Sequence, residues 1–235
     1  MSHWWKYPLV DVLPFSLQVY YRLLEIYNQA FWPLQIAALV AACLIFVSLL
    51  SRRDPGPLVV TPLCLAVAFV WIAWAFFIQS YATLNWAAPF FAGAFVLQAV
   101  IFAAMALPRY RLRLAQPRSR RVVAGFAVFA LALVIYPLLP LAADRPWLQA
   151  EYVGFGPDPT AIAALGILAA SQGRLRWFAM VIPVLWCLIS GGIQATLGSH
   201  FAWLVVAGAT VAIVAALTPA KAAASRAESE AALRR

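Results

Sequence analysis

Charge is scarce in this sequence. Charged residues make up 11% of its 235 positions, whereas apolar residues make up 65%. A soluble domain is usually about 25% charged and about 45–50% apolar, so this chain has too few polar side chains to cover a surface that faces water. The composition excludes a soluble domain, a disordered chain and a collagen-like chain. It predicts an all-α integral membrane protein, whose surrounding solvent is lipid.

Cysteine, histidine and lysine are also rare, and their positions exclude several kinds of chemistry. The three cysteines stand in separate apolar stretches, without the CxxC or CxxH spacing of a zinc knuckle or a redox pair. The only lysines, Lys6 and Lys221, lie outside every apolar stretch, which excludes a retinal Schiff base in the membrane. The sequence also lacks GxSxG and HExxH motifs. We therefore expect no catalytic residues, no metal site and no cofactor, and we expect that the protein is not an enzyme.

What the chain has is long apolar stretches. A hydrocarbon core about 30 Å thick needs roughly 17–25 residues of helix. The candidate spans are Phe31–Leu50, Leu58–Ile78, Trp86–Leu107, Val122–Ala143, Thr160–Ala170, Trp177–Ala195 and Phe201–Leu217. The fifth is the shortest, and it either crosses the bilayer or dips into it and returns. Just before it, Asp158 suits an N-cap and Pro159 suits the first helical position.

The distribution of basic residues decides between these two topologies. With seven spans, fourteen lysines and arginines lie on one side of the membrane and three on the other. With a re-entrant fifth segment the two sides are nearly equal. Because basic residues accumulate on the cytoplasmic side, we predict seven transmembrane helices, with the N-terminus outside and the C-terminus in the cytoplasm.

The predicted bundle covers residues 31–217 and is flanked by two other segments. Residues 218–235 are expected to form a flexible cytoplasmic tail, and residues 1–30 an outer-face segment with an interfacial amphipathic helix. The polar residues of this helix recur at helical spacing on one face. They are Gln18, Arg22, Glu25 and Gln29. The alternative is a lead-in turn that is continuous with the first span.

A second basic feature is the loop between the third and fourth spans. It carries six arginines and no acid between Arg109 and Arg121. A short loop of this kind sets the topology and contacts anionic lipid, so we expect membrane lipid as a partner there and no nucleic acid.

Polar residues within or beside the spans are the candidates for function. They either form hydrogen bonds between helices or line a polar path. The predicted substrate path consists of Gln35, Gln98, Tyr136, Asp158, Trp186 and Gln194. In this interpretation the turn Gly156–Thr160 presents the positive end of the fifth span at the outer mouth.

A short motif also recurs along the chain. Pro33-x-x-Ile36-Ala37-Ala38-Leu39 in the first span returns as Pro159-x-x-Ile162-Ala163-Ala164-Leu165 in the fifth. Together with matching proline, glycine and basic positions, it predicts a parallel 3+1+3 repeat in which the fourth span is the linker. The alternative is coincidence, because alanine-rich helices match each other easily.

Four blocks of the sequence carry a family resemblance. They are Tyr27-Asn28-x-x-x-Trp32-Pro33-x-Gln35; Asn85 with Gln98; Gly156-x-Asp158-Pro159-Thr160 with Gly166-Ile167-Leu168; and Ile182-Pro183-x-Leu185-Trp186-x-x-Ile189-x-Gly191-Gly192. Over most of residues 14–217 the chain resembles a family of uncharacterised bacterial membrane proteins, the domain of unknown function 6064. Members usually have cysteine where this chain has Asp158, so a thiol or soft-metal role is not carried over.

This resemblance implies a multi-pass protein of the bacterial cytoplasmic (inner) membrane and supplies no activity. The function that we expect is a small-molecule or metal-ion permease. The alternative is a non-catalytic accessory or structural subunit of a larger membrane protein complex. A larger complex or a homo-oligomer is accordingly an expected form of the protein.

Overall fold

The computed structural model describes most of the chain. The described residues are 15–51, 56–117 and 119–218. The first fourteen residues of the predicted outer-face segment, and the predicted tail from residue 219 onward, lie outside them. Within the described residues the chain is all-helical, as the composition predicted, and its β structure is limited to an isolated bridge between Leu114 and Ser171.

The described residues form eight α-helices and three shorter elements. The α-helices are α1 (Leu17–Ala30), α2 (Leu34–Ser51), α3 (Pro57–Trp71), α4 (Ala88–Ala106), α5 (Arg120–Ala142), α6 (Pro157–Ala170), α7 (Leu175–Thr196) and α8 (Ala202–Leu217). The π-helix Ile72–Ile78 continues α3, and 3₁₀ helices cover Tyr81–Thr83 and Trp147–Gln149.

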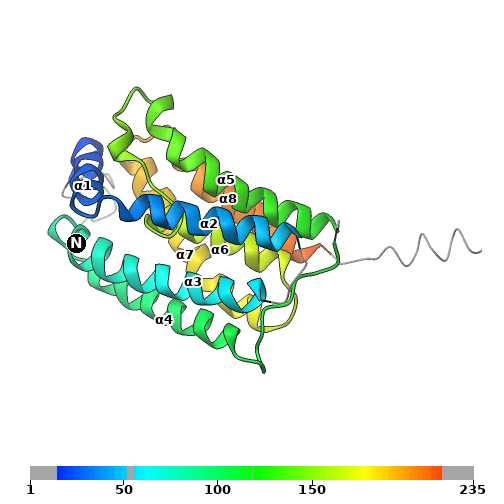
Figure 1. Cartoon of the computed structure of the whole chain (residues 1–235). Helices are drawn as coiled ribbons and strands as arrows, with labels where there is room; N and C mark the ends of the chain where they lie inside the picture. The colour runs from blue at the N-terminus through cyan, green and yellow to red at the C-terminus, as the bar shows by residue number, and fades with distance from the viewer. Residues whose placement is uncertain (1–14, 52–55, 118, 219–235) are drawn as a thin grey trace, which may run out of the picture.

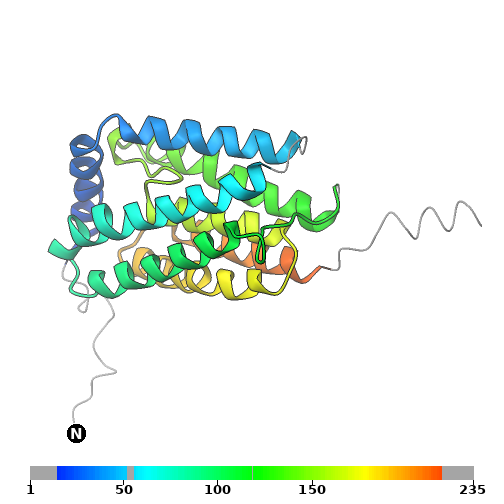
Figure 2. The ribbon, with the colours of Figure 1, turned by 60° about the horizontal axis from the view of Figure 1, so that its bottom comes forward.

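The helices α2 to α8 run back and forth along a common direction, and α1 lies across one end of the bundle (Figures 1 and 2). We call this end the α1 end and the other the opposite end. Ser16 caps α1, because its side chain accepts a hydrogen bond from the Val19 N–H. Residues on one face of α1, among them Tyr27 and Asn28, are buried against the bundle. The helix ends at Ala30, before α2 begins, so the two are separate elements.

Five helical segments are long and apolar enough to cross a membrane. They are Leu34–Ser51, Leu58–Thr83, Ala88–Ala106, Arg120–Ala142 and Leu175–Thr196. The helices α6 and α8 are apolar but shorter, with 14 and 16 residues. At 1.5 Å per residue α6 is about 21 Å long. The structure therefore supports a membrane protein with five helices of spanning length. The predicted seven spans, their orientation and the 3+1+3 repeat stay predictions.

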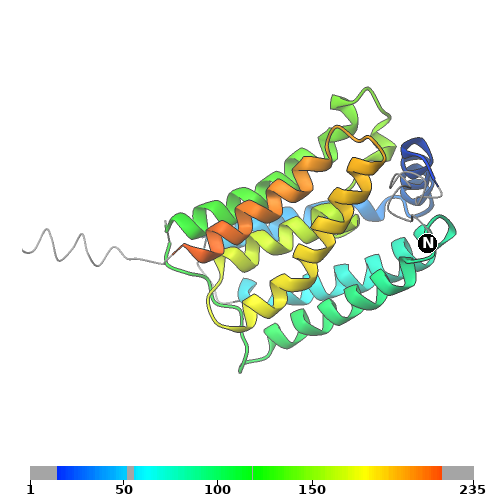
Figure 3. The same ribbon diagram turned by 180° about the vertical axis from the view of Figure 1, so that it is seen from behind.

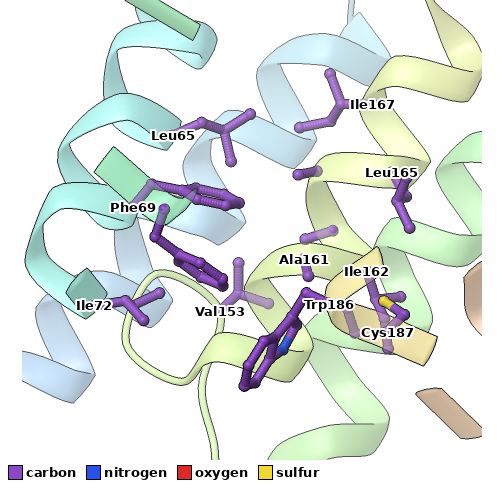
Figure 4. Close-up of a cluster of buried hydrophobic side chains, with 14 of the residues drawn as sticks. Leu65, Phe69, Ile72, Val153, Ala161, Ile162, Leu165, Ile167, Trp186 and Cys187 are labelled. Atoms are coloured by element: carbon purple, nitrogen blue, oxygen red, sulfur yellow. The ribbon is translucent and has the colours of Figure 1, made fainter. Parts of the chain in front are cut away.

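The centre of the bundle is α6, all of whose residues are buried. It packs against α5, α7, α8 and α3, and α8 lies between α5 and α7 on the back of the molecule (Figure 3). Its contact with α5 is especially close, because a Cβ atom at Gly166 would lie 2.5 Å from the Gly125 carbonyl oxygen. Small residues allow this approach of two backbones. On another side, α6 meets a core in which Leu65 and Phe69 face Ile167 (Figure 4).

The helix α2 is the least enclosed of the long helices. Only 17% of it is buried, against 39–44% for the other candidate spans. Because its exposed side chains are apolar around most of its circumference, lipid is the solvent that suits it.

Candidate functional site at the start of α6

The first turn of α6 carries a completely buried aspartate. Asp158 is the second residue of the helix, and none of its surface is exposed. The prediction that Asp158 is the N-cap and Pro159 the first helical residue was wrong: Gly156 is the N-cap, without a side-chain cap, and Pro157 is the first residue of the helix. The physical reason is that the carboxylate turns away from its own helix end and toward donors on α7.

Three donors from one face of α7 hold this carboxylate. Trp186 Nε1 donates to Oδ1 at 2.8 Å, and Ser190 Oγ and Gln194 Nε2 donate to Oδ2 at 2.9 and 2.5 Å. Residues four apart lie above one another on a helix, so α7 presents its three donors as a ladder. A buried charge is costly unless it is hydrogen-bonded, and bonds to an ionised acceptor are the stronger ones. The ladder is therefore suited to a charged carboxylate.

Aromatic packing fixes the indole of Trp186. Its ring meets Phe77, Phe91 and Phe95 edge to face, with centroid distances of 5.0, 5.3 and 5.5 Å. Edge-to-face contacts of this kind are favourable. They hold the indole N–H toward Asp158 on α6.

A second acid, Glu151, lies on the loop that leads into α6. Tyr20 on α1 donates to its Oε1 at 3.4 Å, whereas its Oε2 is buried and has no hydrogen-bond partner. Gly156 leaves room for this side chain, since a Cβ there would lie 2.9 Å from the Cβ of Glu151. Burial, and next the nearby charge of Asp158, raises the pKa of Glu151 well above its ordinary value.

A cation, Arg145, lies near Glu151 on the same loop. Its guanidinium stacks over the ring of Tyr21, with 3.6 Å from Cζ to the ring centroid. Its Nε and Nη1 atoms are buried without a hydrogen-bond partner. Burial lowers the pKa of Arg145, and the charge of Glu151 acts in the other direction.

Tyr20, Arg145 and Glu151 are among the residues that surround a polar cavity of about 30 Å³ at the α1 end. Tyr136, Arg145 and Glu151 line it, and each of them has a buried polar atom without a hydrogen-bond partner. Gln194 lines the cavity as well and connects it to Asp158. A bound water needs at least about 10–15 Å³ and two to four polar partners. The cavity thus has the size and chemistry for one or two waters or one small ion.

The other end of α6 is held by two arginines. Arg121 Nε donates to the Ala169 carbonyl at 2.8 Å. Arg176 donates to the Ser171 carbonyl at 3.1 Å and to a carbonyl of α8 at 3.0 Å. Cations suit the negative end of a helix, as an acid suits the positive end. The sequence had placed both arginines in loops, but the structure buries them in the first turns of α5 and α7.

Of the six predicted path residues, the structure brings four together. They are Tyr136, Asp158, Trp186 and Gln194. The other two serve as links between helices away from this site. Gln35 Nε2 donates to the backbone oxygen of Asn28 and ties α2 to α1. Gln98 Nε2 donates to the Ala179 carbonyl at 3.0 Å and ties α4 to α7.

Four residues of the site are not among the six predicted path residues. They are Tyr20, Arg145, Glu151 and Ser190. A signal existed for Ser190, because it falls midway between Trp186 and Gln194 at spacings of four. For Glu151 and Arg145 there was no periodic signal, since a loop that folds back into a bundle has no regular spacing.

Five of the described helical segments are apolar and long enough to span a membrane, and the bundle encloses the buried carboxylate of Asp158. The protein therefore belongs to the class of all-helical proteins with the character of a membrane protein. Within that class, the chain belongs to DUF6064, a family of unknown function whose model matches residues 17–227. No curated protein and no solved structure matches the chain.

Proposed function

We propose that the protein is a permease for a small cation, with its binding site in the polar cavity at the α1 end. One observation carries the proposal: Tyr136 and Glu151, each with a buried oxygen that has no hydrogen-bond partner, line a space that suits a small ion. With both acids ionised, Glu151 and Asp158 carry two negative charges against one positive charge on Arg145. A monovalent metal cation that displaces the proton of Glu151 would balance this cluster.

The proposal includes the predicted topology. In it, α2 to α8 all cross a bacterial cytoplasmic membrane, and the α1 end faces outward. The helix α6 is about 21 Å long by its rise per residue, shorter than a hydrocarbon core of about 30 Å. Its ends therefore lie below both membrane surfaces, where Asp158 at one end and Arg121 and Arg176 at the other extend the polar regions inward.

A cation bound in this cavity meets a closed barrier. The residues of α6 beyond Thr160 are apolar apart from the backbone, and all are buried. Passage to the opposite end therefore requires a rearrangement of helices, as in alternating access, rather than diffusion through an open pore.

Uptake of radioactive sodium and rubidium ions into proteoliposomes tests the proposal. The wild-type protein should exceed protein-free liposomes, and E151Q and D158N should lose most of this uptake. D144N is the matched control, because Asp144 is an exposed acid near the same loop and has a backbone φ of 51°, which suits asparagine. Uptake by E151Q equal to that of D144N would reject the permease.

A non-catalytic subunit of a larger membrane complex is the second candidate. The saturation of Asp158 by three donors favours it, because a structural carboxylate is held in the same way. Purification in mild detergent separates the two. A stoichiometric partner protein supports the subunit, whereas a monomer or homo-oligomer supports the permease.

Lipid contact at the opposite end is part of the same proposal. The described arginines that are exposed there are Arg109, Arg111, Arg113, Arg120 and Arg174. Their positive charge would attract anionic headgroups. Arg121 does not join them, because its side chain turns inward to the end of α6.

A further inference from the structure

A second and much larger cavity, of about 490 Å³, lies between α2 and α3. It differs from the site at the start of α6 in being lined almost entirely by apolar side chains. Phe129 of α5 and Ile167 of α6 line its inner side, and Val153–Phe155 line it at the α1 end. Its volume lies within the roughly 300–1,000 Å³ that is typical of ligand pockets.

The cavity is elongated along the two helices. On α3 its lining extends from Thr61 to Trp71, and on α2 from Leu34 to Ile45. With a rise of 1.5 Å per residue, ten residues of helix correspond to about 15 Å. An elongated apolar slot of this length fits an extended hydrocarbon chain better than a compact solute.

Small residues keep this slot open. Ala38 and Ala42 on α2 face it together with Ala68 on α3. On the loop before α6, Gly154 has a φ of +85°, and a Cβ there would meet the Ala38 Cβ at 3.5 Å. The outer wall is α2, the helix with the least burial, so the slot lies beside the surface where lipid is expected.

One polar side chain among those that line the slot has an oxygen without a hydrogen-bond partner. The side chain of Thr61 has no exposed surface, and its Oγ1 makes no hydrogen bond. Thr61 lies in the second turn of α3, close to the opposite end of the bundle. A buried hydroxyl without an acceptor is unfavourable, so a bound molecule with an acceptor within reach of Thr61 would gain a hydrogen bond there.

We propose that the slot binds one acyl chain of a membrane phospholipid, and that Thr61 donates a hydrogen bond to its ester carbonyl. In a phospholipid the ester carbonyls lie at the border of the hydrocarbon region, and the position of Thr61 near one end of the bundle matches that depth. The chain then runs along α2 and α3 and ends below Val153–Phe155. This inference does not depend on transport, because the slot and the polar cavity are separate.

Native mass spectrometry of the full chain tests this proposal. The protein is reconstituted in nanodiscs of phosphatidylethanolamine and phosphatidylglycerol, and lipid retention is measured after release into detergent. A68F fills the slot with a phenyl ring, and T61V removes the hydroxyl while keeping the shape. The matched controls are A103F, on an exposed position of α4, and T210V, whose exposed hydroxyl bonds within α8.

The wild-type protein should retain one phospholipid per chain, as should A103F and T210V. T61V should retain roughly fivefold less, which corresponds to the loss of one hydrogen bond. A68F should retain almost none, and thermal unfolding of each variant shows that it is folded. Equal retention by the wild type, T61V and A68F would overturn the proposal. So would a retained mass that fits a free fatty acid or an isoprenoid lipid instead of a phospholipid.

Discussion

The indole Nε1 of Trp186 lies 2.8 Å from Oδ1 of Asp158 and joins the middle of α7 to the first turn of α6. Both side chains are buried. Because an isolated carboxylate is costly in such a place, Asp158 is stable there only while α7 keeps its donors opposite the start of α6. The contact therefore fixes how the two helices face each other and shapes the site at the same time.

Trp186→Phe is predicted to destabilise the protein by about 1–3 kcal/mol, because it leaves a buried acceptor with one donor fewer. The phenyl ring preserves most of the packing against Phe77 and Phe95, so the lost hydrogen bond dominates the effect. Thermal or chemical unfolding in detergent measures the change. Trp86→Phe is the control, since Trp86 is 78% exposed.

A double-mutant cycle with D158N separates the hydrogen bond from packing. If Trp186 acts through the carboxylate, W186F should cost less in the D158N background than in the wild type. Equal costs in both backgrounds would show that the indole contributes packing alone.

Glu151 gives the protein a pH-dependent stability. Burial raises its folded pKa above the ordinary value of 4.5. Above that value the unfolded chain releases a proton that the folded chain still holds, so the free energy of unfolding falls with rising pH. The contribution of Glu151 is fully present below pH 4.5 and is lost as the pH passes its raised folded pKa.

The variant E151Q removes this titration. Its melting temperature in detergent should fall less between acidic and alkaline pH than that of the wild type, with D144N behaving like the wild type. A pH profile for E151Q as steep as the wild-type profile would assign the dependence to other groups.

Hydropathy predicted the helices, but it could not predict their burial. The segments Ile36–Leu39 and Ile162–Leu165 have identical sequences, yet Ile36 is 48% exposed on α2 and Ile162 is 0% exposed on α6. In lipid an apolar side chain is stable whether it faces a helix or an acyl chain. The sequence therefore contains no signal for which apolar helix becomes the centre of the bundle.

The candidate site was predictable where it depends on helix periodicity. Trp186 and Gln194 share a face of α7 because they are eight residues apart, and Asp158 stood at a recognisable helix start. Gln98 shows the limit of this reasoning. Its contact with the Ala179 carbonyl depends on how α4 and α7 pack, which no local pattern encodes.

The buried guanidinium of Arg176 gives a further prediction. It donates to the backbone carbonyl of Ser171, the residue that follows α6, and to the backbone carbonyl of Ala216 in the last turn of α8. Hydrogen bonds from charged groups contribute about 1.5–3 kcal/mol each. R176M should therefore lower the free energy of unfolding by a few kcal/mol. R174M should have little effect, because Arg174 is exposed. Similar stability of the two variants would mean that water replaces the arginine at these carbonyls.

The contact between α5 and α6 leads to the sharpest structural prediction. A Cβ at Gly166 would lie 2.5 Å from the Gly125 carbonyl oxygen and 2.8 Å from the Phe129 nitrogen, both of which are backbone atoms. Backbone cannot move aside without separating the helices, so G166A should destabilise the protein by at least about 1–3 kcal/mol. G93A places the same methyl group where no atom lies within 4 Å, and it should be neutral or slightly stabilising because alanine favours helix. If G166A unfolds at the same temperature as G93A, α5 and α6 do not pack as closely as described.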